Sequence, residues 1–275
     1  MTPDAIAAAF LQACHAELQA LKPGNVHIHA GGHGMTLADF EASAAAAAPH
    51  IAKGGARVGE RILRAVEATR EKVGQNTNLG IVLLAAPLAA SAEHASGLGL
   101  RHGLSRVLAS LDRQDAELCF RAIALASPGG LGTLPDHDVR GPARIALLHA
   151  MRLAAPRDRI ARQYVANFAD IFDLGIPAHD AADASDAAAK VYWRFLTTFP
   201  DSHIARKFGD PKAEMVRQLA QAMDYILRET SGQRDRMRLL LRLDKMLKAE
   251  GLNPGTSADL TVATVFARAL LASDK

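Results

Sequence analysis

Apolar residues recur along most of the chain at three- and four-residue intervals, the spacing of one face of an α-helix. In segment 3–21 the residues that follow this spacing are Ile6, Phe10, Cys14, Leu18 and Leu21. Pro23-Gly24 then ends the pattern, as such a pair commonly does at the end of a helix. We find no convincing run of alternating β-branched residues that would indicate a strand. The pattern therefore predicts an all-α protein.

The same spacing predicts further helices, separated by segments that contain glycine and proline. They are expected at about 37–49, 51–72, from 77 onward, 112–127, 142–154, 157–174, 184–199, 211–230, 233–250 and 257–272. The helix that begins near Thr77 is apolar nearly all round, which is typical of a helix at the centre of a bundle. We expect one compact domain of about ten helices, spanning residues 1–275.

The composition fits a helical protein that acts on an anionic small molecule. The chain has 275 residues, of which 49% are hydrophobic and only 5% aromatic, and its many alanines favour helix. A formal net charge of +3 suits an anionic substrate but does not by itself argue for nucleic acid. The densest basic run, 234–248, interleaves cations with apolar residues and indicates a solvated amphipathic helix.

Three features of the sequence bear on location. Cys14 and Cys119 are too few for a disulfide scaffold, and both lie in apolar patterns typical of buried thiols. The N-terminus lacks the basic and apolar segments of a signal peptide. The longest apolar run, Leu79 to Ala90, has 12 residues and is too short to span a bilayer. We therefore expect a cytoplasmic protein with no membrane partner.

Polar residues concentrate at three helix boundaries, and we interpret these clusters as three walls of one site. The densest cluster holds Asp201, His203, Arg206 and Lys207. Such a cluster is costly to desolvate if buried and has no packing role if exposed, so a charged ligand is its simplest explanation. The two cations can neutralise phosphates, and arginine can do so through two parallel hydrogen bonds.

The other two clusters are Lys22-Pro23-Gly24-Asn25 and Gln75-Asn76-Thr77-Asn78. The first supplies a cation, a rigid bend and a glycine that lets the backbone approach a ligand. Taken alone, it is explained as the end of a helix with a lysine that the helix dipole favours. The second opens an apolar helix, whose free backbone N–H groups could hold a phosphate. Ordinary N-capping is the alternative, but capping needs only one of the three residues Asn76, Thr77 and Asn78.

Carboxylates near these clusters are candidate bases and metal ligands. Glu17 lies near the inward stripe of its helix, where it must be paired, hydrated or bound to a metal, unless it reaches water at the boundary. Glu60 could point at the Asn76 region and help hold a divalent cation, or form ordinary surface ion pairs. In the glycine-rich loop 128–142, Asp136 and Asp138 offer oxygen ligands that suit Mg²⁺ bound through phosphates. The alternative is that both residues only form ordinary Asp turns.

Two other segments contain titratable residues. His27, His29 and His33 lie close together, but their spacing in a glycine-rich loop is not a specific zinc signature, and His33 is the better candidate to face a ligand. Asp259 follows a turn at Asn253-Pro254-Gly255, and we expect it in the first turn of a capped helix. An acid in that position is favoured by the helix dipole, which explains Asp259 without a functional role.

Taken together and in this order, these segments resemble the triphosphoribosyl-dephospho-CoA synthase family. The matching pieces are Glu17 with Lys22-Pro23-Gly24, Gly32-His33-Gly34-Met35 with Phe40, Gly59-Glu60, Gly74-Gln75-Asn76-Thr77-x-x-Gly80, Asp201…Arg206-x-x-Gly209 and Asn253-Pro254-Gly255-x-Ser257-Ala258-Asp259-Leu260. Each motif is short, but together they span nearly the whole chain.

The resemblance implies an all-α enzyme that transfers the triphosphoribosyl group of ATP to the ribose 2′-hydroxyl of 3′-dephospho-CoA and releases adenine. We expect the reaction to depend on Mg²⁺. The expected catalytic residues are Glu17, Glu60 and Asp201, and the expected metal ligands are Asp138, Asp201 and Glu60. The residues expected to bind the substrate and its phosphates are Lys22, Asn25, His33, Asn76, Thr77, Asn78, Arg206 and Lys207.

The chain departs from the family pattern at two places. After Asn76-Thr77 the family typically has His-Lys-Gly, whereas this chain has Asn78-Leu79-Gly80. Arg206-Lys207 stands where the family usually has Arg-Gly-Gly. These forms look like a shorter branch found in archaea and methylotrophic bacteria, so a related phosphoribosyl donor and a C1-carrier precursor are alternative substrates.

Two other classes of function stay open. A non-catalytic protein that binds nucleotides or CoA-like molecules would follow if the altered motif has removed the chemistry. A helical scaffold without a small ligand would leave the polar clusters unexplained. We expect no nucleic-acid partner, and the sequence leaves open whether the chain forms a homo-oligomer.

Overall fold

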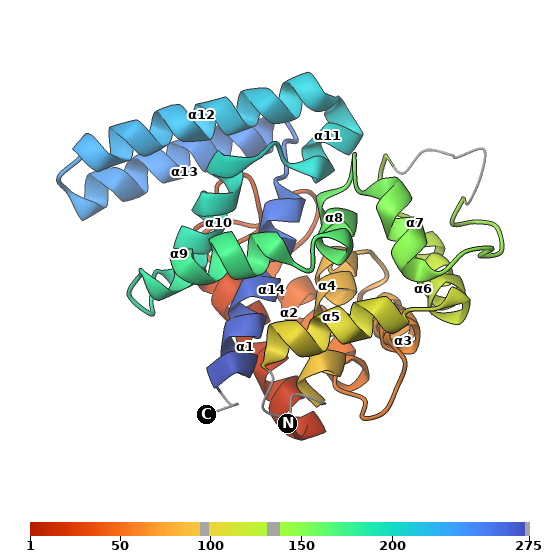
Figure 1. The fold of residues 1–275 in the computed structure, drawn as a ribbon. Coiled ribbons are helices and arrows are strands. Elements are labelled where there is room, and N and C mark those ends of the chain that lie inside the picture. The colour runs from red at the N-terminus through yellow and green to blue at the C-terminus, as the bar shows by residue number, and fades with distance from the viewer. Residues whose placement is uncertain (94–98, 131–137, 273–275) are drawn as a thin grey trace.

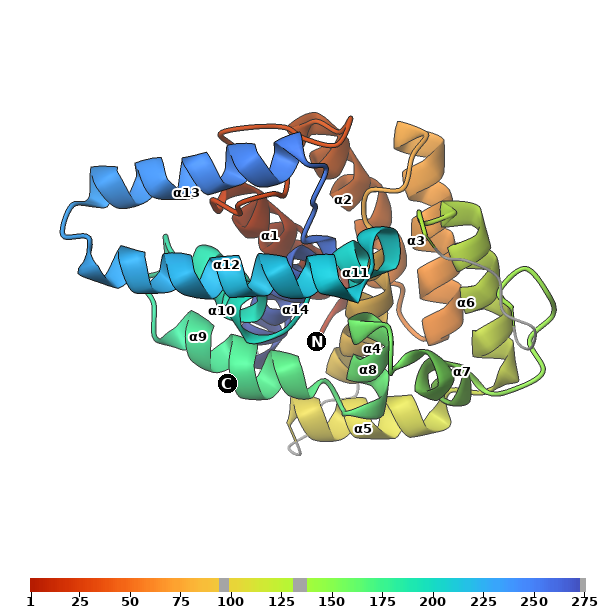
Figure 2. The ribbon, with the colours of Figure 1, turned by 90° about the horizontal axis from the view of Figure 1, so that it is seen from above.

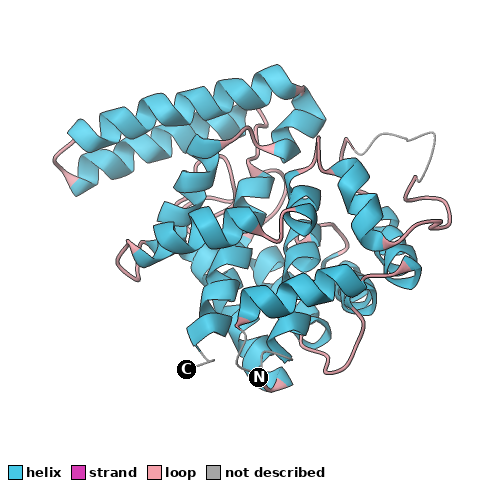
Figure 3. Cartoon of the chain, viewed as in Figure 1, coloured by secondary structure: helices cyan, strands magenta, loops and turns pink. Residues whose placement is uncertain are grey.

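The computed structural model describes residues 1–93, 99–130 and 138–272, and every regular element in these ranges is a helix (Figures 1 and 3). The α-helices are α1 (Pro3–Gln19), α2 (Leu37–Ile51), α3 (Val58–Val73), α4 (Leu79–Glu93), α5 (Leu100–Ser110), α6 (Arg113–Ala126), α7 (Leu147–Ala154), α8 (Arg159–Val165), α9 (Ile176–Asp180), α10 (Ala187–Thr198), α11 (Ser202–Phe208), α12 (Asp210–Glu229), α13 (Gln233–Ala249) and α14 (Gly255–Ala272). A π-helical segment, η1 (Asp170–Gly175), precedes α9. The all-α prediction is confirmed for these residues.

Helix α4 lies at the centre of the larger hydrophobic core. Every residue from Ile81 to Ala92 is buried, and α4 contacts α1, α2, α3, α5, α8 and α14. Because all of its faces are apolar, α4 can be covered by other helices on every side. The buried alanines of α2, which include Ala44, Ala47 and Ala48, are small enough to let this helix pack closely against α1 and α3.

A second, smaller hydrophobic cluster lies under α11, α12 and α13. It includes Ile204, Val216 and Leu247. Helix α10 joins the two clusters, because neighbouring residues on it, Val191 and Tyr192, belong to different ones. Beyond this cluster α12 and α13 lie side by side and extend from the body as a long hairpin (Figures 1 and 2). The two ends of the hairpin that meet the body therefore adjoin α11 and the segment before α14.

The structure contains more helices than predicted, because several are shorter than three turns. Helix α11 has seven residues and α9 has five, too few for a periodic pattern to be recognised. The predicted helix 157–174 is divided at Asn167 and Phe168, which have φ values of 49° and 56°. Helix α5 occupies part of the glycine-rich segment 96–104, and α2 continues through Pro49.

No helix in the described ranges is long and apolar enough to cross a bilayer.

Candidate active site

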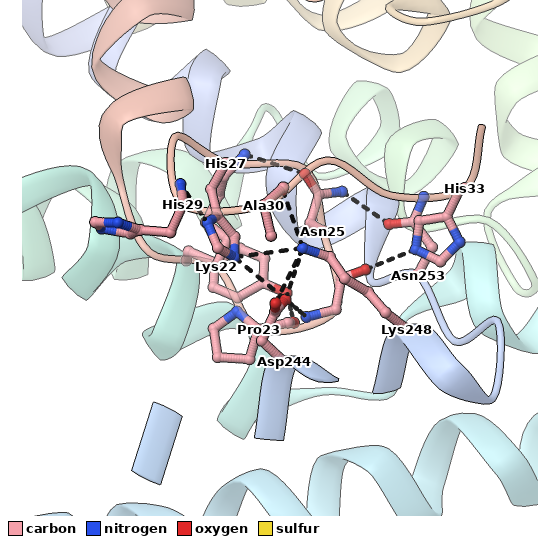
Figure 4. Close-up of polar contacts among 12 residues, drawn as sticks. Lys22, Pro23, Asn25, His27, His29, Ala30, His33, Asp244, Lys248 and Asn253 are labelled. Carbon is pink, nitrogen blue, oxygen red and sulfur yellow. Dashed lines mark hydrogen bonds and ion pairs between the residues drawn. The ribbon is translucent and has the colours of Figure 1, made fainter. Parts of the chain in front are cut away.

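The buried side chain of Lys22, just after α1, belongs to a group of residues joined by polar contacts (Figure 4). Its Nζ pairs with the Glu17 carboxylate and donates to Asn25 Oδ1 at 3.0 Å, and Lys22 is 0% exposed. Burial raises the pKa of Glu17 and lowers that of Lys22, while each charge opposes the shift in the other. The two charges therefore stabilise one another within the protein, and the ammonium group does not reach solvent.

The bend at Pro23-Gly24 is held by close packing. Gly24 has a φ of +87°, and a Cβ atom there would lie 2.8 Å from Pro254 Cδ, so only glycine fits without a shift. The Tyr192 hydroxyl on α10 donates to the carbonyl of Pro23 at 2.7 Å. These contacts fix the direction in which the chain leaves α1 and hence the position of Lys22.

Two further hydrogen bonds tie this bend to the C-terminal part of the chain. Gly24 N donates to Asp244 Oδ1 on α13 at 2.9 Å. Asn25 Nδ2 donates to Asn253 Oδ1 at 2.8 Å, just before α14 (Figure 4). Residues more than 200 positions apart in the sequence thus form one polar wall.

Contacts with α13 hold the histidine-rich loop in place. His27 Nε2 lies 3.2 Å from Asp244 Oδ1, and Lys248 Nζ donates to the Ala30 carbonyl at 3.1 Å (Figure 4). His33, which has a φ of 56°, places Nε2 2.8 Å from the Gly24 carbonyl. Among the described residues, no three His, Cys, Asp or Glu side chains gather into a group able to hold a metal ion.

Asp201, predicted to act as a base and a metal ligand, is the N-cap of α11. Its Oδ1 accepts from the backbone of His203 at 2.9 Å and of Ile204 at 3.3 Å. Its Oδ2 accepts from Ser257 N and Oγ, both at 2.8 Å. Burial raises the pKa of Asp201, opposed by these four hydrogen bonds. With 1% exposure and both oxygens engaged, Asp201 joins α11 to α14 in this structure rather than facing a ligand.

The cations of α11 lie beside the loop that follows α6. Arg206 Nε donates to the Gly129 carbonyl at 2.9 Å, and Nη1 lies 3.4 Å from Asp158 Oδ2. Lys207 is exposed, and a Cβ atom on Gly129 would lie 3.0 Å from its Cε. Burial and the charge of Arg206 lower the pKa of Lys207. Two neighbouring cations with partly exposed heads suit a ligand of high negative charge.

Asp259 is a site residue that sequence reasoning set aside. Helix α14 begins at Gly255, so Asp259 lies beyond the first turn, contrary to prediction. Its carboxylate lies against Gly80, where a Cβ atom would be 2.0 Å from Oδ2. Among the described contacts, no hydrogen bond or ion pair reaches this partly exposed carboxylate. Burial and the charges of Asp201 and Glu17 raise its pKa well above the usual range.

A signal for Asp259 was present in the sequence. In the sequence it is the one charged residue of segment 255–267, whose other residues are apolar or carry a small hydroxyl group. A carboxylate within such an apolar helix needs an explanation other than the helix dipole.

The start of α4 borders the same region. Asn76 Oδ1 caps the α4 backbone, Thr77 Oγ1 donates to Ser43 Oγ at 2.6 Å, and Asn78 Nδ2 donates to Thr69 Oγ1 at 3.0 Å. The side chains of Thr77 and Asn78 are therefore used to tie α4 to α2 and α3. A small recess beside this point is lined by Cys14, Glu17, Leu18, Phe40, Ala44, Asn78 and Ile81.

The structure does not bring Glu60 to these residues. Glu60 is exposed in the first turn of α3, whereas Asn76 follows the last turn. A helix rises 1.5 Å per residue, so about 20 Å separates Glu60 from the end of α3. The interpretation that Glu60 points at the Asn76 region therefore does not hold.

The loop 128–142 is described only in part. Asp138 Oδ1 accepts from the backbone N–H of Arg140 at 2.9 Å and also lies near its guanidinium. This geometry is that of an Asp turn. Asp136 and His137 lie outside the described residues.

Comparison with known proteins shows what kind of protein carries this site. The family model described as ATP:dephospho-CoA triphosphoribosyl transferase (CitG) matches residues 3–275. A solved structure from Archaeoglobus fulgidus, described as a triphosphoribosyl-dephospho-CoA synthase, is similar with a TM-score of 0.67 and 25% identity. The similarity covers 85% of this chain and 99% of the archaeal one. No curated protein matches significantly. Because the family match covers nearly all of the chain, the chain belongs to the ATP:dephospho-CoA triphosphoribosyl transferase family.

Proposed function

We propose that Asp259 is the catalytic carboxylate, and that the site transfers the triphosphoribosyl group of ATP to the 2′-hydroxyl of 3′-dephospho-CoA. The observation that carries this proposal is the position of Asp259: it is partly exposed, no described hydrogen bond or ion pair engages it, and it lies against the Gly80 backbone. Lys22, Glu17, Asp201 and Arg206 are all close enough for their charges to act on this part of the site.

The transfer exchanges one bond at the anomeric carbon for another. The bond between C1′ of the ATP ribose and N9 of adenine breaks, and a bond between C1′ and the acceptor oxygen forms. The hydroxyl proton passes to Asp259, adenine leaves as its N9 anion and takes one proton from water, and Asp259 then returns its proton to the solvent. A raised pKa makes this carboxylate a stronger base. In its ionised form, its negative charge stabilises the positive charge that develops on the ribose.

The other predicted residues take supporting roles in this proposal. Arg206 and Lys207 bind the phosphates, because their cationic groups reach the surface of the site. Lys22 and Glu17 are positioning residues, because their buried ion pair holds the chain beside Asp259 without contacting substrate. Asp201 is also a positioning residue, because its four hydrogen bonds fix α11 against α14.

We propose that Mg²⁺ enters with the triphosphate of ATP. The described residues form no metal-binding cluster of three side chains, which fits an ion held mainly by phosphates and water. Asp158, which is partly exposed beside Arg206, is the carboxylate that would complete its coordination. When bound there, the ion would neutralise phosphate charge.

The test is an adenine-release assay by chromatography with Mg²⁺-ATP and 3′-dephospho-CoA. Removal of a general base costs about 100- to 10,000-fold, so we expect a loss of this size in kcat for Asp259→Asn. Asp183→Asn, at an exposed loop position, is the matched control and keeps the kcat of the unchanged protein. Full kcat in the Asp259→Asn protein would refute the assignment of Asp259.

A nucleotide-binding protein without turnover is the second candidate. The observation that favours it is Leu79, which is 8% exposed in the core where the family usually has a cation. Tight Mg²⁺-ATP binding by calorimetry, with no adenine released from ATP when either 3′-dephospho-CoA or a C1-carrier precursor is the acceptor, would establish this alternative. Adenine release that depends on both substrates would exclude it.

A further inference from the structure

The imidazole ring of His203 is fixed between α11 and the start of α14. The backbone N–H of His203 donates to Asp201 Oδ1 at 2.9 Å and to Thr256 Oγ1 at 3.1 Å. A Cβ atom on Gly255 would lie 3.1 Å from His203 Nδ1, so the ring packs directly on the backbone there. The ring position is therefore set by two helices and not by the side-chain rotamer alone.

One ring nitrogen of His203 has a partner and the other has none. Nδ1 lies 3.4 Å from Arg206 Nη2. Because a guanidinium group only donates hydrogen bonds, Nδ1 is the acceptor and the ring proton is assigned to Nε2. Nε2 is buried and has no hydrogen-bond partner in the described structure. A buried donor without an acceptor has lost its hydration without compensation, and a bound ligand would supply the missing acceptor.

The surroundings of His203 determine what kind of acceptor fits. Burial and the neighbouring charges of Lys207, Arg206 and His33 lower the pKa of His203 to about 3. The ring is therefore neutral at physiological pH and keeps an N–H donor at Nε2. Since Arg206 and Lys207 on the same helix are cationic, an anionic oxygen complements them best.

We propose that His203 Nε2 donates to a non-bridging phosphate oxygen of a polyphosphate held by Arg206 and Lys207. This inference rests on the proposed function, because ATP and 3′-dephospho-CoA both carry linked phosphates. His203 thus adds a neutral, directional donor to two cations. The donor fixes the orientation of the phosphate chain, which charge alone leaves free.

Two substitutions distinguish the role of the Nε2–H donor of His203 from the role of its ring. In His203→Gln the amide nitrogen reaches about as far as Nε2, whereas in His203→Asn it corresponds to Nδ1 and supplies no donor farther out. We would titrate inorganic tripolyphosphate, Mg²⁺-ATP and 3′-dephospho-CoA into each protein by calorimetry. We expect His203→Asn to weaken binding about 10- to 100-fold and His203→Gln to stay within about threefold. His102→Asn, exposed on α5, is the control and binds as the unchanged protein does.

The three ligands distinguish the two sources of phosphate. A loss confined to tripolyphosphate and ATP assigns His203 to the donor triphosphate, and a loss confined to 3′-dephospho-CoA assigns it to the acceptor. Unchanged binding of all three ligands by folded His203→Asn overturns the proposal, and so does a failure of His203→Gln to restore binding. Because binding is measured without turnover, a protein that binds through His203 but releases no adenine refutes only the proposed function.

Discussion

At Asp259 the fold keeps a carboxylate in surroundings that oppose its charge. Asp201 and Glu17 lie close enough to repel it, and burial removes much of its hydration, so its pKa is raised well above the usual range. Among the described contacts, no hydrogen bond offsets this burial and repulsion, in contrast to Asp201, both of whose carboxylate oxygens accept hydrogen bonds. Such an arrangement lowers the free energy of unfolding, and it places a basic group within the site.

Asp259→Asn should therefore stabilise the protein at high pH while it removes activity. The folded state binds the Asp259 proton more tightly than the unfolded chain, so this group favours folding below its unfolded pKa of 3.8 and loses that contribution as pH rises. At pH 8 we expect the free energy of unfolding to rise by about 1 kcal/mol, or about 2–4 °C in Tm. Thermal unfolding of the Asp259→Asn protein and the unchanged protein at pH 4.5 and pH 8 measures this change in stability. A Tm difference between the two proteins that is equal at both pH values would contradict the prediction.

The buried pair of Lys22 and Glu17 makes a second prediction at the residue scale. Lys22→Met leaves the Glu17 carboxylate buried without its partner, which should destabilise the protein by about 3–5 kcal/mol. The double variant Glu17→Gln with Lys22→Met removes both charges and should recover much of that loss. Chemical denaturation of the two single variants and the double variant gives the coupling. Strictly additive effects would show that the pair does not act as a unit.

At the scale of elements, the site depends on how α13 holds the loop after α1. Asp244 accepts from the backbone of Gly24, lies 3.2 Å from His27 and pairs with Lys248. Although burial opposes its charge, hydrogen bonds from His27, Lys248 and Gly24 lower the pKa of Asp244. One carboxylate on α13 thus fixes a loop whose residues are about 220 positions away in the sequence.

Removal of that carboxylate should loosen the loop. Asp244→Ala leaves buried donors without an acceptor, and we expect a loss of about 2 kcal/mol in the free energy of unfolding. Native-state hydrogen exchange should show faster exchange at Gly24 and through 25–33, while α5 is unchanged. Asp235→Ala, exposed on the same helix, serves as the comparison. Unaltered exchange at Gly24 would mean that other contacts hold the loop.

At the scale of the molecule, the hairpin of α12 and α13 meets the site only at its base. Helix α12 starts one residue after Gly209 and α13 ends shortly before Asn253. The buried residues of both helices, which include Ala213, Val216, Leu243 and Leu247, lie in the halves near this base. Twenty residues of helix span about 30 Å, so the far tip is remote from Asp259.

Shortening of the hairpin should accordingly leave kcat/KM of the reaction nearly unchanged. Residues 226–237 contain no buried position, and their replacement by a short Gly-Ser linker removes the tip alone. We expect a change in unfolding free energy of about 0.5 kcal/mol or less, and kcat/KM within about twofold in the adenine-release assay. If the folded, shortened protein lost activity, the tip would have to contribute to substrate binding or to assembly.

The sequence by itself determined the helical class, the central place of α4 and the clusters at Lys22, Asn76 and Arg206, together with the family resemblance. These follow from local information, since periodicity depends on neighbours within a few turns and polar clusters are contiguous. It did not reveal α11 or the break at Asn167, because short helices and left-handed residues depend on packing around them.

Only the tertiary structure decided which polar groups are free to act. The sequence predicted Asp201 to be a base and explained Asp259 by the helix dipole alone, but Ser257 and the α11 backbone occupy Asp201 and leave Asp259 unengaged. Glu60 shares a motif with the site, yet the rigid length of α3 separates it from Asn76. Burial, hydrogen-bond saturation and distance through space are properties of the assembled fold, and no local pattern specifies them.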